Sequence, residues 1–181
     1  RLFLIKLNNL IKNCTNSFEK YDYSKAKTEI EKFFWDFCDN YLEIVKKRIY
    51  NKTGYKKLSA QYTLYKSLLT ILKLIAPIMP FITEEIYQNY FKKTEKEKSI
   101  HLTKWPISEK IVEKTEILDL FLDILTKVRQ EKSTAKKPMN SEIVLTLPKS
   151  EKNKIKPLSE DLKDVTNTKE IKEGGFGVEF V

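Results

Sequence analysis

Apolar residues recur at spacings of three and four along most of residues 1–130, and this periodicity restricts the chain to a mainly helical fold. The first stripe predicts a helix from near the start of the chain to about Glu19. Its members are Phe3, Leu7, Leu10, Cys14 and Phe18. Asp22 and Ser24 follow at once and supply N-cap chemistry for a second helix.

That second helix carries two neighbouring apolar stripes, which predicts one long helix packed against more than one partner. One stripe contains Ala26, Ile30, Phe33, Phe37, Tyr41, Ile44 and Arg48, and the other contains Phe34, Cys38, Leu42, Val45 and Ile49. A loop with Gly54 follows, and Ser59 is predicted to cap a third helix that ends before Pro77. Its inward residues are predicted to be Leu64, Leu68, Ile71, Leu72 and Ile75.

Pro80 fits the first turn of a fourth helix, where its missing amide hydrogen costs nothing. The predicted buried side of this helix consists of Ile82, Ile86 and Tyr90 with Phe81 and Phe91. We then expect a charged loop over residues 94–98, an extended piece over 100–102 and an anchor at Trp105–Pro106 that pins the chain to the bundle. A fifth helix follows, with Ile117, Phe121, Ile124 and Val128 on its inner face.

From Ser141 the pattern changes to alternation, as in a half-buried strand with Ile143, Leu145 and Leu147. A helix interrupted near Pro157 and two short extended runs follow, joined by a Gly174–Gly177 hairpin turn. The predicted fold is therefore mainly α. A bundle of about five helices over residues 1–137 precedes a small β-α-β-β unit over 138–181.

The positive charge is concentrated in the first part of the chain. Residues 1–115 hold 22 lysines and arginines against 13 acidic residues, whereas residues 116–181 hold 12 of each. Between Glu43 and Glu84 there is no acidic residue. The basic residues in that interval are Lys46, Lys47, Arg48, Lys52, Lys56, Lys57, Lys66 and Lys73. A local excess of this kind favours a docking face for a polyanion over a merely solvated surface.

Residues suited to catalysis are scarce, so the sequence favours recognition over chemistry. His101 is the one histidine, and Cys14 and Cys38 lack metal-site or disulfide spacing. Neither a phosphate-binding glycine loop nor a nucleophile elbow occurs. Tyrosines do accompany the basic run, namely Tyr41, Tyr50, Tyr55, Tyr62 and Tyr65. Aromatic stacking with basic phosphate contacts is how unpaired RNA bases are bound, although Tyr41 and Tyr65 equally fit the edge of a core.

Three segments resemble landmarks of valyl-tRNA synthetases, which are class I aminoacyl-tRNA synthetases. They are Phe33–Glu43 (FFWDFCDNYLE), Leu72–Tyr87 (LKLIAPIMPFITEEIY) and Ser99–Pro106 (SIHLTKWP), in the family's order and spacing. The second is shared more loosely with isoleucyl, leucyl and methionyl enzymes, so Phe37–Glu43 is the discriminating piece. The closing residues 171–181 resemble the ending of archaeal-type valyl enzymes.

This resemblance implies an anticodon-binding helical domain that holds the anticodon arm of tRNA(Val). It implies Leu42 as an apolar contact to an anticodon base and Lys46, Lys47 and Arg48 as phosphate ligands. Asn40, Tyr41 and Lys52 are further candidates. The family's ATP-handling motifs and editing domain are absent from this sequence. We therefore expect no catalytic residue and no cofactor in this segment, with ATP and Mg²⁺ used by the full-length valine–tRNA ligase.

Two alternatives stay open at this point. One is the equivalent domain of an isoleucyl-tRNA synthetase, and the other is a non-enzymatic helical module that binds a protein partner through its aromatic face. The expected partners are the tRNA and the catalytic domain of the same polypeptide. No apolar run is long enough to span a membrane, and we expect a cytoplasmic monomer cut from a longer polypeptide.

Overall fold

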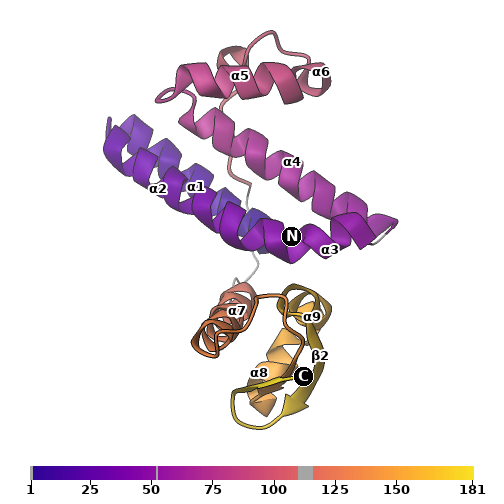
Figure 1. The fold of residues 1–181 in the computed structure, drawn as a ribbon. Helices are drawn as coiled ribbons and strands as arrows, with labels where there is room; N and C mark the ends of the chain where they lie inside the picture. Colours follow the sequence, from indigo (N-terminus) through magenta and orange to yellow (C-terminus); the bar gives the residue numbers. More distant parts are fainter. Residues whose placement is uncertain (1, 52, 110–115) are drawn as a thin grey trace. The chain divides into compact units, whose positions relative to one another are not determined.

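The computed structural model describes residues 2–51, 53–109 and 116–181 and divides into two compact units (Figure 1). Unit 1 takes in residues 1–39 and 53–113, and unit 2 takes in residues 40–52 and 114–181. The predicted fold class is confirmed, because the chain is mainly helical and ends in a small α/β unit. This division differs from the predicted boundary at residue 137, since α7 (Glu116–Thr134) packs with the C-terminal elements.

Unit 1 is a helical bundle whose core begins at the paired helices α1 (Leu2–Glu19) and α2 (Tyr23–Asp36), side by side in Figure 1. The Phe3 ring lies 5.1 Å from that of Phe33 and 5.9 Å from that of Phe37, measured between centroids. Asp22 caps α2 as predicted, because its carboxylate accepts the Lys25 amide at 3.1 Å. The predicted apolar stripes of the first two helices therefore pack against each other.

The predicted second helix is interrupted by a π-helical segment, Phe37–Tyr41, before it continues as α3 (Leu42–Asn51). An extra residue in a turn rotates everything after it by about 100° around the helix axis. The stripe is buried up to Phe37, but beyond the π segment Ile44 and Val45 are buried together and Arg48 is only half-buried. The uniform period assumed in the sequence prediction is wrong at this point.

α4 (Tyr55–Ile75) starts earlier than predicted, because Gly54 rather than Ser59 is its N-cap. Gly54 has a φ of 70°, which glycine adopts without the steric cost that other residues meet. Ser59 lies inside the helix, where its carbonyl accepts the Thr63 hydroxyl at 2.9 Å. The helix ends at Ile75, two residues before Pro77, as predicted.

α5 (Pro80–Tyr90) begins with Pro80 in its first turn as predicted, and part of its predicted buried side is confirmed, because Phe91 is buried and Ile86 is half-buried against the same core. Three side chains predicted to be inside are exposed, namely Phe81, Ile82 and Tyr90. Thr83 and Tyr87 are buried instead. The Thr83 hydroxyl donates to the Met79 carbonyl at 2.8 Å and that of Tyr87 to the Glu97 carbonyl at 3.2 Å. Because these hydroxyls have acceptors, burying them costs little.

The segment after α5 contains a short helix, α6 (Lys92–Glu95), and a 3₁₀ turn over Ile100–Leu102, where a loop and an extended piece were predicted. The predicted anchor is confirmed. Trp105 Nε1 donates to Thr15 Oγ1 at 2.9 Å, and the Trp105 ring lies 5.2 Å from that of Phe18. The crossing segment is thereby attached to α1.

Unit 2 contains the predicted β-α-β-β order. β1 (Ile143–Leu147) is followed by α8 (Lys149–Ile155), a 3₁₀ turn at Lys156–Leu158, α9 (Ser159–Thr166), β2 (Thr168–Glu173) and β3 (Gly177–Phe180). The sheet order is β2-β1-β3, with β1 parallel to β2 and antiparallel to β3.

The glycine-rich turn does not form the predicted hairpin, because β2 and β3 flank β1 and do not pair with each other. The turn instead crosses over the end of β1. A Cβ on Gly174 would lie 2.8 Å from Thr146 Cγ2, so a larger residue there would force Thr146 or the turn to shift.

One buried lysine ties the parts of unit 2 together. Lys132, on α7, is 1% exposed, and its Nζ donates to the carbonyl oxygens of Met139 (2.8 Å), Ser141 (2.9 Å) and Thr166 (2.7 Å). The ammonium has three hydrogens, so all of them are used. Lys132 therefore holds the loop before β1 and the end of α9 against α7.

Candidate nucleic-acid interface

The predicted site residues cluster on and just before α3, which belongs to unit 2 and packs against α9. Lys46 is exposed, and its Nζ lies 3.1 Å from Glu43 Oε1, one turn earlier on the same helix. Exposed pairs of this kind contribute little stability and exchange readily with solvent. Lys46 can therefore turn toward a phosphate at small cost.

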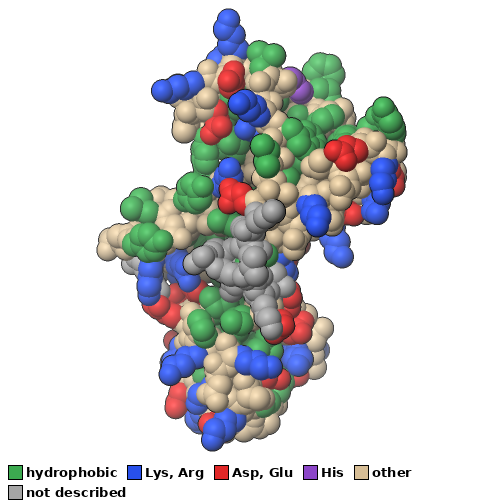
Figure 2. Space-filling view, turned by 180° about the vertical axis from the view of Figure 1, so that it is seen from behind, with side chains coloured by type: hydrophobic (Ala, Val, Ile, Leu, Met, Phe, Trp, Pro, Cys, Tyr) green, Lys and Arg blue, Asp and Glu red, His purple; other side chains and the backbone are tan. Residues whose placement is uncertain are grey.

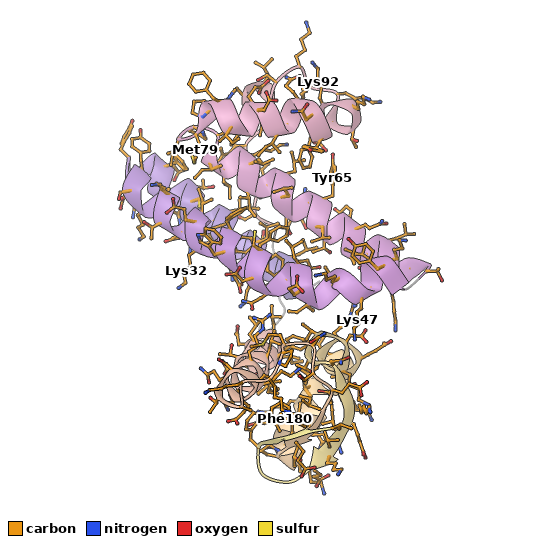
Figure 3. The ribbon with its side chains drawn as sticks, viewed as in Figure 1. Lys32, Lys47, Tyr65, Met79, Lys92 and Phe180 are labelled. Carbon is orange, nitrogen blue, oxygen red and sulfur yellow. The ribbon has the colours of Figure 1, made fainter. Side chains whose placement is uncertain are left out.

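Lys47 and Arg48 are turned toward acidic residues of α9. Lys47, labelled in Figure 3, lies with its Nζ 4.0 Å from Asp164 Oδ1 and remains partly exposed. Arg48 is held more firmly, because its Nε donates to Asp161 Oδ1 at 2.5 Å and its Nη2 also contacts Oδ2. Burial opposes charge on Arg48, but the bond and attraction to Asp161 outweigh it and raise the pKa of the guanidinium.

The remaining candidates differ in exposure and engagement. Asn40 accepts a hydrogen bond from Arg129 Nη1 at 2.8 Å, within unit 2. Tyr41 is half-buried, and Leu42 is 37% exposed, so its side chain can be reached from solvent. Lys52 lies outside the described residues. Six of the seven predicted residues therefore share one helical stretch, with Arg48 committed to a carboxylate.

The tyrosines of the basic run fall into two groups, exposed rings that could stack on RNA bases and rings at the edge of the core. Tyr50, on α3, is exposed, as are Tyr55 and Tyr62 on α4. Tyr65 is half-buried, with its hydroxyl donating to Glu95 Oε1 at 2.8 Å and its ring 5.0 Å from that of Phe91. Tyr65 is thus a residue of the core edge, whereas the exposed rings are available for stacking.

Unit 2 also contains a cavity of about 640 Å³ between α3, α7 and α9. Two predicted residues, Lys46 and Lys47, line it, together with Arg129 from α7 and Asp164 from α9. Neither Arg129 nor the α9 aspartates Asp161 and Asp164 were among the predicted site residues. The end of α7 is basic in sequence, with Lys127, Arg129 and Lys132, but no sequence pattern indicates that it lies beside α9.

Charged side chains of both signs are intermixed on the face shown in Figure 2, where Lys and Arg are interspersed with Asp and Glu. On α4 of unit 1, Lys56 and Lys66 are exposed, whereas Lys73 lies 3.8 Å from Glu95 Oε2. The excess of basic residues in the sequence is thus partly offset by acidic neighbours that lie far away along the chain.

Groups suited to catalysis remain scarce in the structure. Burial raises the pKa of the Cys14 thiol to about 12, which keeps it protonated, and burial also raises the pKa of Cys38. Within residues 2–51, 53–109 and 116–181, no group of three or more His, Cys, Asp or Glu side chains is placed to hold a metal ion. In the same ranges, no helix has the length and apolar character needed to cross a membrane.

Comparison with known proteins gives a consistent family. The family described as "Anticodon-binding domain of tRNA ligase" matches residues 1–147. The chain is 39% identical over 178 residues to the valine–tRNA ligase of Orientia tsutsugamushi, covering 93% of this chain and 21% of that protein. It is 42% identical over 177 residues to the valine–tRNA ligase of Ehrlichia ruminantium (strain Gardel), with the same coverage.

An archaeal relative is matched over a shorter stretch. The valine–tRNA ligase of Pyrococcus furiosus is 36% identical over 147 residues, which is 79% of this chain and 16% of that protein. The chain therefore spans about a fifth of the length of these relatives. Because the family match takes in most of the 181 residues, the chain belongs to the family of anticodon-binding domains of tRNA ligases.

Proposed function

We propose that this chain is the part of a valine–tRNA ligase that binds the anticodon arm of tRNA(Val). The observation that carries the proposal is the family match over residues 1–147 together with the similarity to valine–tRNA ligases over 93% of the chain. The full-length protein would attach valine to the tRNA at the expense of ATP with Mg²⁺. Its catalytic domain is then the second partner of this segment.

We propose α3 and the residues before it as the RNA-binding segment. Lys46 and Lys47 would contact phosphates, because their side chains are 57% and 41% exposed. Their ion pairs with Glu43 and Asp164 are weak and can be exchanged for a phosphate. Leu42 would contact a base, and Asn40 and Tyr41 would lie beside it. A phosphate contact by Arg48 requires its ion pair with Asp161 to break. Lys52, which lies outside the described residues, is the last proposed RNA-binding residue.

The first experiment measures specificity. Full-length protein would be titrated with transcripts of tRNA(Val) and tRNA(Ile), each also prepared with the other's anticodon. The tRNA(Ile) transcript that carries the valine anticodon should bind, and the tRNA(Val) transcript that carries the isoleucine anticodon should bind weakly. In the presence of ATP and Mg²⁺, the protein should attach valine rather than isoleucine. Binding that follows the isoleucine anticodon would favour the isoleucyl enzyme, and loss of valine attachment altogether would reject the assigned reaction.

The second experiment tests the RNA-binding residues through salt dependence. Each lost phosphate contact reduces the slope of log affinity against log salt by about one unit. Lys46→Ala with Lys47→Ala should therefore reduce the slope by about two units in total. Lys25→Ala with Lys32→Ala is the matched control, because both lysines are exposed on α2, and Figure 3 labels Lys32.

An unchanged slope in the α3 variant would remove these residues from the interface. A helical module that binds a protein partner would show neither anticodon dependence nor a salt slope set by these lysines. Size measurement of the full-length protein with and without tRNA tests the expected monomer. Fractionation of the source cells tests the expected cytoplasmic location.

A further inference from the structure

The cavity of unit 2 combines an apolar floor with a charged rim, so its ligand should have both an apolar part and a charged part. Its volume of about 640 Å³ falls within the range of about 300–1,000 Å³ typical of small-ligand pockets. α3 contributes one wall, α7 the second, and the end of α9 the third. All of the lining residues belong to unit 2, so the cavity is formed within one compact body.

The floor of the cavity is apolar. Leu125 and Val128 of α7 line it and are 2% and 1% exposed, so they are fixed by packing around them. Val165 of α9 is half-buried beside them. Met139, which is 53% exposed, stands in the loop before β1 and presents a flexible, polarisable thioether. The apolar surface open to a flat ring therefore comes from Met139 and Val165, with Leu125 and Val128 packed behind it.

The rim carries three cations and two carboxylates. Lys46 and Lys47 line it from α3 and Arg129 from α7, against the carboxylates of Glu43 and Asp164. Lys132 also lines the cavity, but its three hydrogens are given to backbone carbonyls, so it holds the wall in place. The rim can therefore meet a phosphate with more than one cation, while the carboxylates can accept hydrogen bonds from amino groups.

Simpler occupants leave part of this arrangement unexplained. A free phosphate makes no use of the apolar floor, and an uncharged apolar molecule makes no use of three cations. We propose that this cavity takes a single unpaired nucleotide, with its base on Met139 and Val165 and its phosphate on Lys46, Lys47 and Arg129. The proposal rests on the proposed function, because the anticodon loop would supply that nucleotide.

The test uses full-length protein and a short RNA hairpin with the valine anticodon. In separate hairpins, each loop base in turn is replaced by 2-aminopurine or by an abasic site. Met139→Asp places a negative charge at the mouth of the cavity and keeps the backbone carbonyl that Lys132 holds. Met79→Asp is the matched control, since Met79, labelled in Figure 3, is 46% exposed and lies in unit 1.

We expect one loop position at which 2-aminopurine fluorescence changes on binding and at which base removal weakens binding about tenfold. Met139→Asp should abolish that fluorescence change and weaken binding of the unmodified hairpin, whereas Met79→Asp should bind like the parent protein. The hairpin with an abasic site at that position should bind Met139→Asp almost as well as the unmodified hairpin does, because the variant has already lost the contact to that base.

The outcomes separate the two proposals. If the parent protein does not bind the hairpin at all, the proposed function fails and the nucleotide site fails with it. If the hairpin binds with every abasic site tolerated, or if Met139→Asp behaves like Met79→Asp, the cavity does not take a nucleotide while the proposed function stands. Thermal unfolding of both variants must match the parent protein, and Met139→Ala repeats the test without a new charge.

Discussion

Arg48 on α3 and Asp161 on α9 form a two-point hydrogen-bonded ion pair across 113 residues of sequence. The Asp161 side chain is only 5% exposed, whereas Arg48 retains 28% exposure. A planar guanidinium that meets both carboxylate oxygens is the strongest arrangement for such a pair. The pair therefore joins the predicted RNA-binding helix to the C-terminal α/β elements.

Removing one partner of this pair should destabilise the chain. Arg48→Met leaves the buried carboxylate of Asp161 without its main counter-charge, and we expect a loss of about 2–3 kcal/mol in the free energy of unfolding. Asp161→Asn should cost a similar amount, and the double variant should cost less than the sum. Urea unfolding followed by circular dichroism gives these values. Additive losses would show that the two side chains do not interact.

The same variant separates a structural role from a phosphate contact. If Arg48 acts on RNA only by holding α3, Arg48→Met should weaken tRNA binding without changing the salt slope, whereas Lys46→Ala should change the slope by about one unit. Lys46→Ala should leave unfolding nearly unchanged, because its pair with Glu43 is exposed. A reduced slope for Arg48→Met would instead show that Arg48 contacts a phosphate.

Lys132 should be the most sensitive lysine of unit 2. Lys132→Met leaves three carbonyl oxygens without the ammonium that they share, and we expect a loss of at least about 3 kcal/mol in the free energy of unfolding. Lys127→Met is the control on the same helix. Its Nζ lies 5.5 Å from the centre of the Phe176 ring, a contact that contributes about 0.5–1 kcal/mol at an exposed site. Equal losses of stability in Lys132→Met and Lys127→Met would show that the three bonds of Lys132 contribute nothing special to unit 2.

Glu84 should make the stability of unit 1 depend on acid pH. Burial opposes its ionisation, but hydrogen bonds from Gln88, Ser99 and the Ile100 amide, with His101 nearby, outweigh burial and lower its pKa from 4.5. The folded state thus binds this proton less readily than the unfolded state. The stabilisation is complete above pH 4.5 and is lost as the pH falls through the lower folded-state pKa.

Glu84→Gln tests this relation. At pH 7 the variant should be less stable by about 1–2 kcal/mol, and the difference should vanish in acid as Glu84 of the parent protein is protonated. Glu85→Gln is the neighbouring control, since Glu85 is exposed and accepts only from Asn89 among the bonds described for its carboxylate. Thermal unfolding across acid pH measures both. A difference that persists unchanged in acid would contradict the ionic role.

Tyr65 should resist ionisation. Burial and the hydrogen bond to Glu95 raise the pKa of its hydroxyl to about 12. Because the folded state retains this proton, stability should fall as the pH rises from the ordinary tyrosine value of 10.0 toward 12. Ultraviolet titration of the phenolate should show a late step that Tyr65→Phe removes. Tyr62→Phe, at an exposed position on the same helix, should leave that step in place.

The outcomes for individual elements show which features local sequence carries. The Asp22 cap, the helix stop before Pro77, Pro80 at a helix start and the alternation at Ile143–Leu147 were all predicted correctly. Each depends on a property of one residue or on a short period. The family could also be identified from the sequence, because its landmarks are short segments of characteristic residues.

Features that depend on which surfaces meet were not predictable in this way. The buried side of α5 was predicted only in part. The Tyr87 hydroxyl is buried because the folded chain brings the Glu97 carbonyl to it, whereas the Thr83 hydroxyl bonds to Met79 one turn earlier on the chain. The sequence likewise established the basic run at Lys46–Arg48, and the fold decided which of those charges are matched by α9. Charge is a property of composition, whereas its neutralisation depends on distances between side chains more than 100 residues apart.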